Sequence, residues 1–165
     1  MIYSNTPFTF TKVFEDNYLE IKEEFNSLST NLLHEWHEKK LYNEGWYVFP
    51  IYNFPNGGPI KEAIELCPKI SELVEKYVPT HGAVGFSILS PGTILNPHKG
   101  YQGDFLRLHV GIDIPKGDCG LNVDGIDYRW KNGEAIVFDD RLEHYAWNKS
   151  QEPRVVLLID FIPAI

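Results

Sequence analysis

The sequence predicts a mainly β protein with helices in its N-terminal part, and two observations carry this prediction. Up to about residue 80, apolar residues recur at helical spacing, whereas from about residue 82 they form short runs separated by turn residues. This second part holds roughly seven or eight such runs, which is typical of a sandwich or a barrel. We expect one domain over residues 1–165, in which the helices cover one face of the β structure.

The helical part begins with Asn17, which is followed three residues later by Glu20 in the spacing of a capping box. A second helix is expected over residues 30–40. A third pattern over residues 60–77 has apolar residues at helical spacing, and Pro68 should break or restart that helix. Between these helices, the aromatic stretch 46–49 predicts a strand, which the following Pro50 places towards a sheet edge.

The β part shows its clearest strand over residues 106–114, where apolar residues alternate strictly with Arg107, His109 and other residues. Further strands are expected over residues 86–89, 135–138 and 155–161. The dipeptides Asp124-Gly125 and Asn132-Gly133 are typical of tight hairpin turns.

Composition excludes several classes of protein. The formal net charge of -8 disfavours nucleic acid and anionic membranes as partners. No stretch approaches the roughly 18 apolar residues that a membrane span needs, and no signal peptide is visible, so we expect a cytoplasmic protein. The two cysteines, Cys67 and Cys119, form no CxxC pair, which argues against a zinc ribbon and a disulfide-rich scaffold.

Two of the six histidines, His98 and His144, are expected near strand ends, where separate strands can deliver side chains to one point. Imidazole binds iron, zinc, copper and nickel alike, so the two histidines alone do not identify the metal. They could also be ordinary loop histidines that bind no metal. We read His34 and His37 as surface residues on the second helix, and His81 as a loop residue without a partner.

Arg107 and His109 share one strand face, opposite a fully apolar face. In a sandwich that polar face would be solvated, whereas in a barrel it could line a cavity and present donors to carboxylates. Arg154 begins the last apolar strand, where it is either an exposed residue or the anchor of an anionic cosubstrate.

Several motifs together resemble the aspartyl/asparaginyl β-hydroxylase family. They are FSILSPGT at 86–93, PHKG at 97–100, LRLH at 106–109, WKNGE at 130–134, VFDD at 137–140, EH at 143–144, WN at 147–148 and Arg154. The resemblance covers roughly residues 82–161, about half of the chain.

The resemblance implies a double-stranded β-helix, the jelly roll of cupins, with a helical preface over about residues 1–80 and the jelly-roll core over about 82–165. It implies that His98 and His144 bind Fe(II), with Gly100 at the position where many related oxygenases carry a third, carboxylate ligand. Ser87 and Arg154 would hold the distal carboxylate of 2-oxoglutarate.

Other site roles also follow from the resemblance. Arg107 and His109 would lie near the metal-side carboxylate or the substrate, and we count them among both the catalytic and the cosubstrate-binding residues. Asp139 and Asp140 would orient a histidine or the loop backbone. Asp104 is not assigned to iron. Trp46 and Trp147 could line the pocket, but large aromatic residues are more often part of the core, and we favour that reading.

The implied activity is that of an Fe(II)- and 2-oxoglutarate-dependent dioxygenase, which uses O₂ and releases succinate and CO₂. The expected reaction is hydroxylation of the β-carbon of an aspartyl or asparaginyl residue, gripped by Arg107 and His109. The substrate could instead be a free amino acid, another small molecule or a lipid-linked acyl group, and a non-catalytic cupin-like binding module is a further alternative. Lys99, Tyr101 and Gln102, in the loop that follows the first histidine, differ from the residues of that loop in the family's animal members. This difference concerns the identity of the substrate much more than the chemistry.

Overall fold

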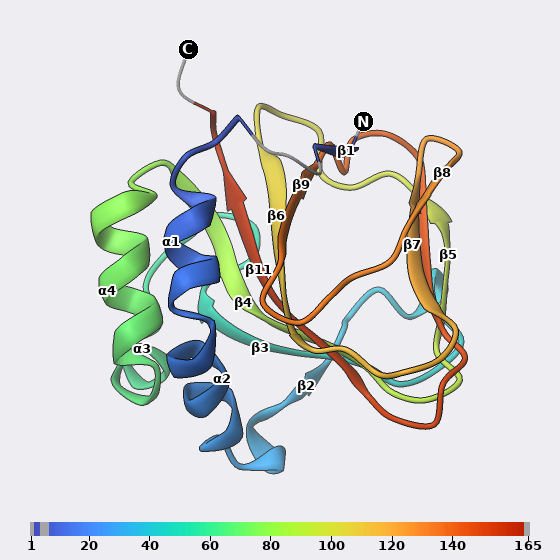
Figure 1. Ribbon diagram of the computed structural model, residues 1–165, viewed down its shortest axis with the longest axis horizontal. Helices are drawn as coiled ribbons and strands as arrows, with labels where there is room; N and C mark the ends of the chain where they lie inside the picture. The colour runs from blue at the N-terminus through green and yellow to red at the C-terminus, as the bar shows by residue number, and fades with distance from the viewer. Residues whose placement is uncertain (1, 4–6, 164–165) are drawn as a thin grey trace.

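Two β-sheets face each other and form the body of the molecule in the computed structural model, which describes residues 2–3 and 7–163 (Figure 1). The larger sheet has the strand order β1-β9-β6-β11-β4-β3-β2, and the smaller has the order β5-β10-β7-β8. All strand pairs are antiparallel. The arrangement is the predicted jelly roll.

The strands follow the predicted stretches, with several additions. The larger sheet contains β1 (Ile2–Tyr3), β2 (His34–Glu35), β3 (Trp46–Tyr52), β4 (His81–Leu89), β6 (Leu106–Asp113), β9 (Ala135–Phe138) and β11 (Arg154–Phe161). The smaller sheet contains β5 (Ile94–His98), β7 (Cys119–Val123), β8 (Ile126–Tyr128) and β10 (His144–Asn148).

Four α-helices cover the outer face of the larger sheet (Figure 1): α1 (Thr11–Asp16), α2 (Tyr18–Asn26), α3 (Lys61–Leu66) and α4 (Pro68–Tyr77). The break predicted at Pro68 is confirmed, because proline starts α4 where no backbone donor is needed. The capping box at Asn17 is wrong. The Asn17 side chain donates to the Val13 carbonyl at 2.7 Å and joins the end of α1 to the start of α2.

The predicted helix over residues 30–40 is also wrong. The chain there forms the 3₁₀ turns η1 (Thr30–Leu32) and η2 (Lys39–Leu41) on either side of β2. Long-range packing overrides helix propensity, since β2 pairs with β3 and the Trp36 ring stacks on Trp46 with centroids 4.6 Å apart. We call residues 34–45 the strap, because they join β3 to β5 of the other sheet, where Asn43 N donates to the Ile94 carbonyl at 3.3 Å. His34 and His37 are exposed, as expected.

Two smaller expectations, about Pro50 and His81, also change. β3 continues through Pro50 instead of ending before it. On one side Pro50 pairs with β4, and on the other side β2 is too short to reach it, because β2 pairs only with Tyr47 and Val48. The N–H that proline lacks is therefore not needed for a hydrogen bond between strands. His81 begins β4 rather than lying in a loop, and its Nδ1 lies 2.8 Å from the Gly82 carbonyl oxygen.

The two turn signals have different outcomes. Asp124-Gly125 forms the predicted hairpin turn between β7 and β8, with φ of 50° and 84°. Asn132-Gly133 also turns the chain, but it lies on the connection from β8 to β9, which belong to different sheets. It is therefore not a hairpin.

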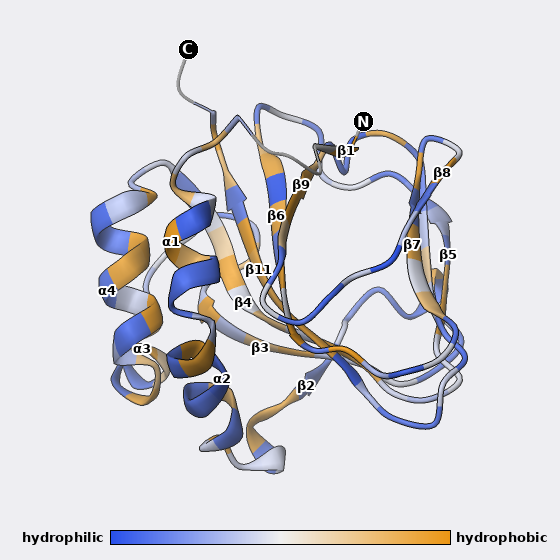
Figure 2. Cartoon of the chain, in the orientation of Figure 1, coloured by the Kyte–Doolittle hydropathy of each residue, from blue (hydrophilic) through white to orange (hydrophobic). Residues whose placement is uncertain are grey.

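Alternation along β6 and β11 gives the larger sheet two different faces. The face towards the helices is apolar and is part of the main core, with Leu108, Val110, Leu157 and Ile159 all fully buried (Figure 2). The face towards the smaller sheet carries Arg107, His109, Arg154 and Asp160. Within the described residues, no helix is long and apolar enough to span a bilayer.

Candidate functional site

His98 and His144 meet between the two sheets, although 45 residues of sequence separate them. His98 ends β5, His144 begins β10, and the two are direct cross-strand partners. Their ring centroids lie 4.3 Å apart. Strand pairing therefore brings together the two histidines that the sequence singled out.

Both rings are oriented by the backbone. The Nδ1 atoms of His98 and His144 lie 2.6 Å from the Asn96 carbonyl oxygen and 2.9 Å from the Leu142 carbonyl oxygen. A carbonyl can only accept, so Nδ1 carries a proton in each ring, and in the neutral ring Nε2 is then the nitrogen with the lone pair. Burial lowers the pKa of His144 to about 3, which keeps this imidazole neutral. A neutral ring with a free Nε2 is the form that binds a metal.

A third protein ligand is not found beside these rings. In residues 2–3 and 7–163, no group of three or more His, Cys, Asp or Glu side chains is placed to hold a metal ion. Gly100 N donates to the Asp140 carbonyl at 2.7 Å, and a Cβ at residue 100 would collide with Asp140 Oδ2. The Asp140 carboxylate thus fills the space that a side chain at residue 100 would need. Asp104 is exposed and lines neither chamber described below.

An inner chamber of about 30 Å³ lies behind the two histidines, and its polar lining residues include Ser87, His109 and Arg154. His109, only 6% exposed, accepts a hydrogen bond at Nδ1 from Trp130 Nε1 at 3.3 Å. Because the indole can only donate, the His109 proton must lie on Nε2, which has no partner among the described residues. Burial, with Arg154 and Arg107 nearby, holds the His109 pKa well below its usual range.

Arg154 is a buried cation without a counter-charge. It is 2% exposed, and its Nη2 donates to Ser87 Oγ at 2.9 Å and to the Ser87 carbonyl at 3.1 Å. Its guanidinium lies 4.6 Å from the Trp130 ring centroid. In the described part of the chain it forms no ion pair, and its Nε has no partner. Burial lowers the Arg154 pKa to about 10, which still leaves it charged at neutral pH.

A buried cation and an unused imidazole donor in one small chamber fit an anionic ligand. An unpaired charge is costly to bury, and an anion that accepts from both groups would remove that cost. The chamber itself holds about one water molecule, so a longer ligand must extend beyond it.

An outer chamber of about 130 Å³ adjoins the inner one, and both are lined by Trp46, His98 and Arg107. The strap supplies one wall through Trp36, Glu38 and Leu41, and the loop after His98 supplies another through Lys99, Gly100 and Tyr101. Trp46 is thus a wall of both chambers, and its Nε1 donates to Ser87 Oγ at 3.1 Å. Trp46 is buried in the core, as we expected, but it also lines the pocket, which is the alternative that we had discounted.

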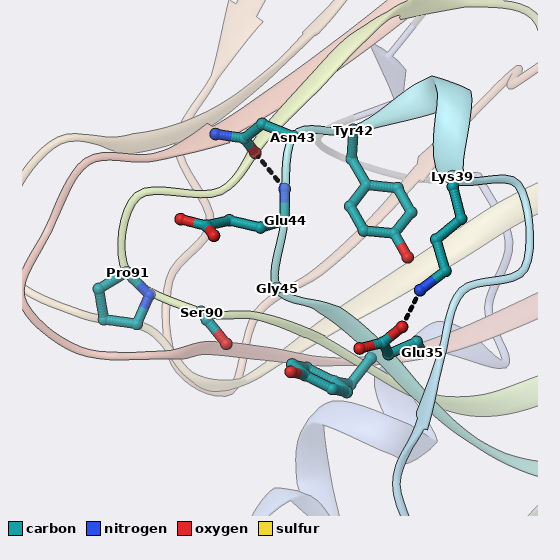
Figure 3. Close-up of a pocket in the computed structure, with 9 residues that line it drawn as sticks. Glu35, Lys39, Tyr42, Asn43, Glu44, Gly45, Ser90 and Pro91 are labelled. Carbon is teal, nitrogen blue, oxygen red and sulfur yellow. Dashed lines mark hydrogen bonds and ion pairs between the residues drawn. The ribbon is translucent and has the colours of Figure 1, made fainter.

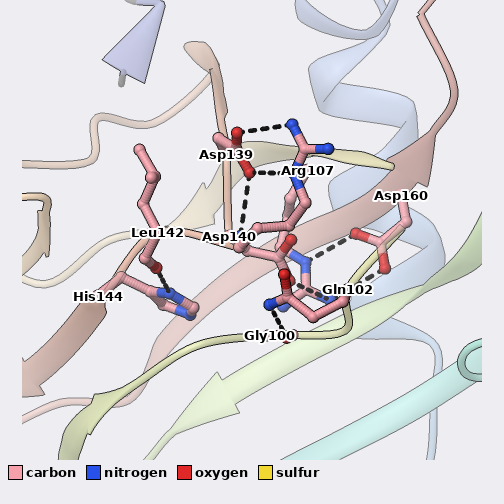
Figure 4. Close-up of polar contacts among 9 residues, drawn as sticks. Gly100, Gln102, Arg107, Asp139, Asp140, Leu142, His144 and Asp160 are labelled. Carbon is pink, nitrogen blue, oxygen red and sulfur yellow. Dashed lines mark hydrogen bonds and ion pairs between the residues drawn. The ribbon is translucent and has the colours of Figure 1, made fainter. Parts of the chain in front are cut away.

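Arg107 is tightly paired in the outer chamber, contrary to the expectation that it is free (Figure 4). Its Nε and Nη2 donate to Asp160 at 2.7 and 2.9 Å, and Nη2 lies 3.4 Å from Asp140 Oδ2. Asp160 is the strand partner of Arg107 on β11.

The paired aspartates have different partners. Asp139 accepts from the Arg141 backbone and guanidinium, and Arg141 in turn donates to the Gly103 carbonyl at 2.6 Å. Asp139 therefore orders the loop that carries Asp140 towards His98. Arg141 lowers the Asp139 pKa, whereas burial raises that of Asp140.

A larger groove of about 450 Å³ lies on another side of the strap and contains none of the predicted site residues (Figure 3). It is lined by Glu35, Lys39, Tyr42, Asn43, Glu44, Gly45, Tyr47, Ser90 and Pro91. Lys39 pairs with Glu35 across it, so these two charges satisfy each other locally.

Sequence reasoning missed three residues of the site: Trp36, Trp130 and Asp160. Asp160 had a signal, since it is the one charge within the apolar run 155–161 and lies six residues from Arg154, on the same strand face. Trp130 stood in a recognised motif without an assigned role. Trp147 lies away from both chambers, where its Nε1 donates to Asp118 at 2.7 Å.

Comparison with known proteins supports this picture of the fold and identifies the family. The model of the aspartyl/asparaginyl beta-hydroxylase family matches residues 15–163. An ornithine lipid ester-linked acyl 2-hydroxylase of Rhizobium tropici is 36% identical over 119 residues, which cover 71% of this chain and 41% of that protein. The human aspartyl/asparaginyl beta-hydroxylase is 31% identical over 70% of this chain and 15% of its own length. The chain thus spans less than half the length of these relatives.

Solved structures show the same fold at low sequence identity. An oxidoreductase of the 2OG-Fe(II) oxygenase family from Burkholderia pseudomallei has a TM-score of 0.65 at 11% identity, over 89% of this chain and 78% of that one. A prolyl-4-hydroxylase of Pseudomonas putida has a TM-score of 0.54 at 12% identity, over 99% and 92% of the two chains. With the family model matched over almost the whole chain, the protein belongs to the aspartyl/asparaginyl beta-hydroxylase family.

Proposed function

We propose that the chain is an Fe(II)- and 2-oxoglutarate-dependent hydroxylase in which His98 and His144 hold the metal. The observation that carries this proposal is the pair of imidazoles, each with Nδ1 turned to a backbone carbonyl and Nε2 left free, next to a chamber with unsatisfied cationic and N–H donors. Two protein ligands leave the remaining coordination positions to small molecules.

The inner chamber is the proposed binding site of one carboxylate end of 2-oxoglutarate, whose other end would extend beyond it. Arg154, with Ser87 beside it, would receive one carboxylate, since guanidinium matches a carboxylate with two parallel donors. The Nε2–H of His109 supplies a further donor to the same ligand. Phe138, Leu121 and Leu158 line the chamber and exclude water from it.

When iron, 2-oxoglutarate and O₂ are bound, oxidative decarboxylation to succinate and CO₂ supplies the oxidising power for converting a substrate C–H into C–OH. The chain orients the ligands and shields them. Arg107 and the walls of the outer chamber position the substrate beside His98.

The first candidate substrate is an aspartyl or asparaginyl side chain, in a peptide or a small molecule, hydroxylated at its β-carbon. This follows the family and the human relative. The second candidate is a lipid-linked acyl group, because the Rhizobium tropici relative, with its 36% identity, is named an acyl 2-hydroxylase.

Succinate release tests the activity. Purified protein supplied with Fe(II), 2-oxoglutarate and O₂ should form succinate, and His144→Ala should not. A candidate substrate should stimulate release and gain one oxygen by mass spectrometry. Tight binding of metal and 2-oxoglutarate without any succinate would instead identify a non-catalytic binding module.

A further inference from the structure

We infer that Trp46, Trp36 and Tyr42 form an electron-transfer path between the proposed metal site and the groove beside the strap. Through this path, a small reductant in solution would discharge the oxidant that forms at the metal when no substrate is bound. The inference rests on the proposed function and gives the strap a second role, which is to protect the site from its own oxidant. It starts from the position of Trp46.

Trp46 brings an oxidisable ring to the proposed metal site. It lines the inner chamber together with His98 and His144, and it lines the outer chamber together with His98. Its Nε1 donates to Ser87 Oγ at 3.1 Å, which holds the indole in this wall. Indole and phenol rings are among the side chains that lose an electron most readily. An oxidant that finds no substrate therefore meets Trp46.

From Trp46, ring contacts continue into the strap. Trp36 stacks on Trp46, with centroids 4.6 Å apart and planes inclined by 19°. Tyr42 meets the Trp46 ring edge-on at 5.6 Å, and its hydroxyl donates to the Trp36 carbonyl at 2.6 Å. Electron transfer in proteins is fast between rings in contact, and a positive charge spread over two stacked rings costs less than the same charge on one. The three residues thus form a continuous path.

Tyr42 ends the path at the groove of about 450 Å³ beside the strap. It is one of the residues that line this groove, and it lines neither of the two chambers (Figure 3). A phenol that loses an electron also loses its proton, and the groove is large enough for water to take that proton. It can also admit a small molecule that returns a hydrogen atom to the phenol oxygen. Tyr42 is therefore the place where the path is reset.

Electrons and protons balance over one turnover without substrate. Reducing the oxidant to water takes two electrons and two protons. Trp46 gives up one electron at a time, and Tyr42 replaces each of them and releases its phenol proton. Two molecules of a hydrogen-atom donor, such as a hydroxamic acid or a hydroxyurea, then restore Tyr42 twice and are each oxidised by one electron. The two protons consumed at the site are balanced by the two that Tyr42 releases.

Electrostatics favour this path over the other indole of the site. Trp130 also lines the inner chamber, but the Arg154 guanidinium lies 4.6 Å from its ring centroid. A positive charge on Trp130 would face that cation at close range, which makes the ring harder to oxidise. Across residues 2–3 and 7–163, no lysine or arginine lies over the ring of Trp36 or Trp46. Oxidation should therefore proceed towards the strap.

Electron paramagnetic resonance tests the path directly. The Fe(II)/2-oxoglutarate complex is mixed with O₂ without substrate or reductant and frozen, and succinate is measured in the same samples. We expect a tyrosyl radical, identified by the narrower signal of protein that carries ring-deuterated tyrosine. The radical should be lost in Tyr42→Phe, which keeps the aromatic ring. It should persist in the matched control Tyr47→Phe, because Tyr47 lines the same groove without being one of the rings packed on Trp46.

Peptide mass spectrometry after repeated turnover without substrate gives a second readout. Added oxygen should be found on Trp46, Trp36 and Tyr42 and should be absent from Trp130. Hydroxyurea added after the radical has formed should remove the signal, because the groove gives it access to Tyr42. If Tyr42→Phe does not fold, the wild-type radical and the wild-type oxidation pattern decide.

Four outcomes would overturn the inference. They are succinate formation without a tyrosyl radical, a radical that persists in Tyr42→Phe, oxidation of Trp130 in place of Trp46, and succinate that forms only when a candidate substrate is added. Failure of the proposed function looks different, because in that case no succinate forms either with or without a candidate substrate.

Discussion

The two faces of β11 show how differently one strand can be used. Val155, Leu157 and Ile159 point to the helices and are buried in an all-apolar core. Arg154 and Asp160 point the other way, into the space between the sheets, and are equally buried. The face towards the helices provides the buried apolar contacts that any stable domain needs. The other buries a guanidinium that has no counter-charge among the described residues, and leaves donor atoms without a partner there.

This difference between the two faces indicates that the ligand-binding site lies on the polar face. Burial of apolar side chains stabilises the chain, whereas unsatisfied polar groups are costly unless a ligand completes them. The helix-covered face therefore offsets the cost of the polar face, and the two should respond to substitution in separable ways. Substitutions on the polar face should affect ligands, and those on the helix side should affect folding.

The largest expected effect is on the histidine pair. His98→Ala or His144→Ala should abolish succinate formation and metal binding while leaving the circular dichroism spectrum unchanged, because each removes one of the two proposed metal ligands. The exposed His34 provides the matched control, and His34→Ala should retain both properties. Retained metal affinity in either site variant would break the assignment.

On the helix side, Leu108→Ala should lower the free energy of unfolding by about 2–5 kcal/mol, since it opens a cavity in the main core. Urea unfolding measures this loss. Below the unfolding transition, the Michaelis constant for 2-oxoglutarate should stay at the wild-type value. Leu19, 69% exposed on α2, gives the control, and its alanine variant should change stability little. A large change in 2-oxoglutarate affinity in Leu108→Ala would contradict the claim that substitutions on the helix side affect folding but not ligand binding.

On the polar face, Arg154→Ala should raise the 2-oxoglutarate concentration needed for half-maximal succinate formation. Each lost hydrogen bond to a charged group is worth about 1.5–3 kcal/mol. Ser87→Ala should have a milder effect, because it removes one neutral contact of Arg154. Equal 2-oxoglutarate dependence in the arginine variant and the wild type would remove Arg154 as the anchor.

The smallest expected effect is on the pH dependence of stability. His109 has a pKa held far below its unfolded value of about 6.5, so the unfolded chain binds the proton more readily. The stability due to its neutral form is complete above pH ~6.5 and declines as pH falls, by up to about 1.4 kcal/mol per pH unit. Urea unfolding of the metal-free protein should show this slope, and His109→Asn should show a shallower one. Parallel pH profiles for the two proteins would contradict the role of His109.

Strict alternation over residues 106–114 was enough to predict a strand with one apolar and one polar face, since period 2 is a local property of extended chain. It did not show whether Arg107 and His109 face solvent or a cavity. That depends on the second sheet, which lies across from them only after β5 and β10 have paired. The helix expected over residues 30–40 failed for a related reason, because the partners of Trp36 and of β2 lie beyond residue 45.

From spacing and turn residues, the sequence by itself predicted a β sandwich or barrel with a helical cover, the break at Pro68 and the hairpin at Asp124-Gly125. Through the family motifs it also predicted the jelly roll and singled out His98 and His144. Each of these predictions depends only on the spacing of nearby residues or on a contiguous motif. The tertiary structure alone decided that Asp160 pairs with Arg107, that Asp140 fills the space beside Gly100, and that Trp130 fixes the proton of His109. Those contacts join residues 21 to 53 positions apart, and their charges and tautomers depend on burial that only the folded chain creates.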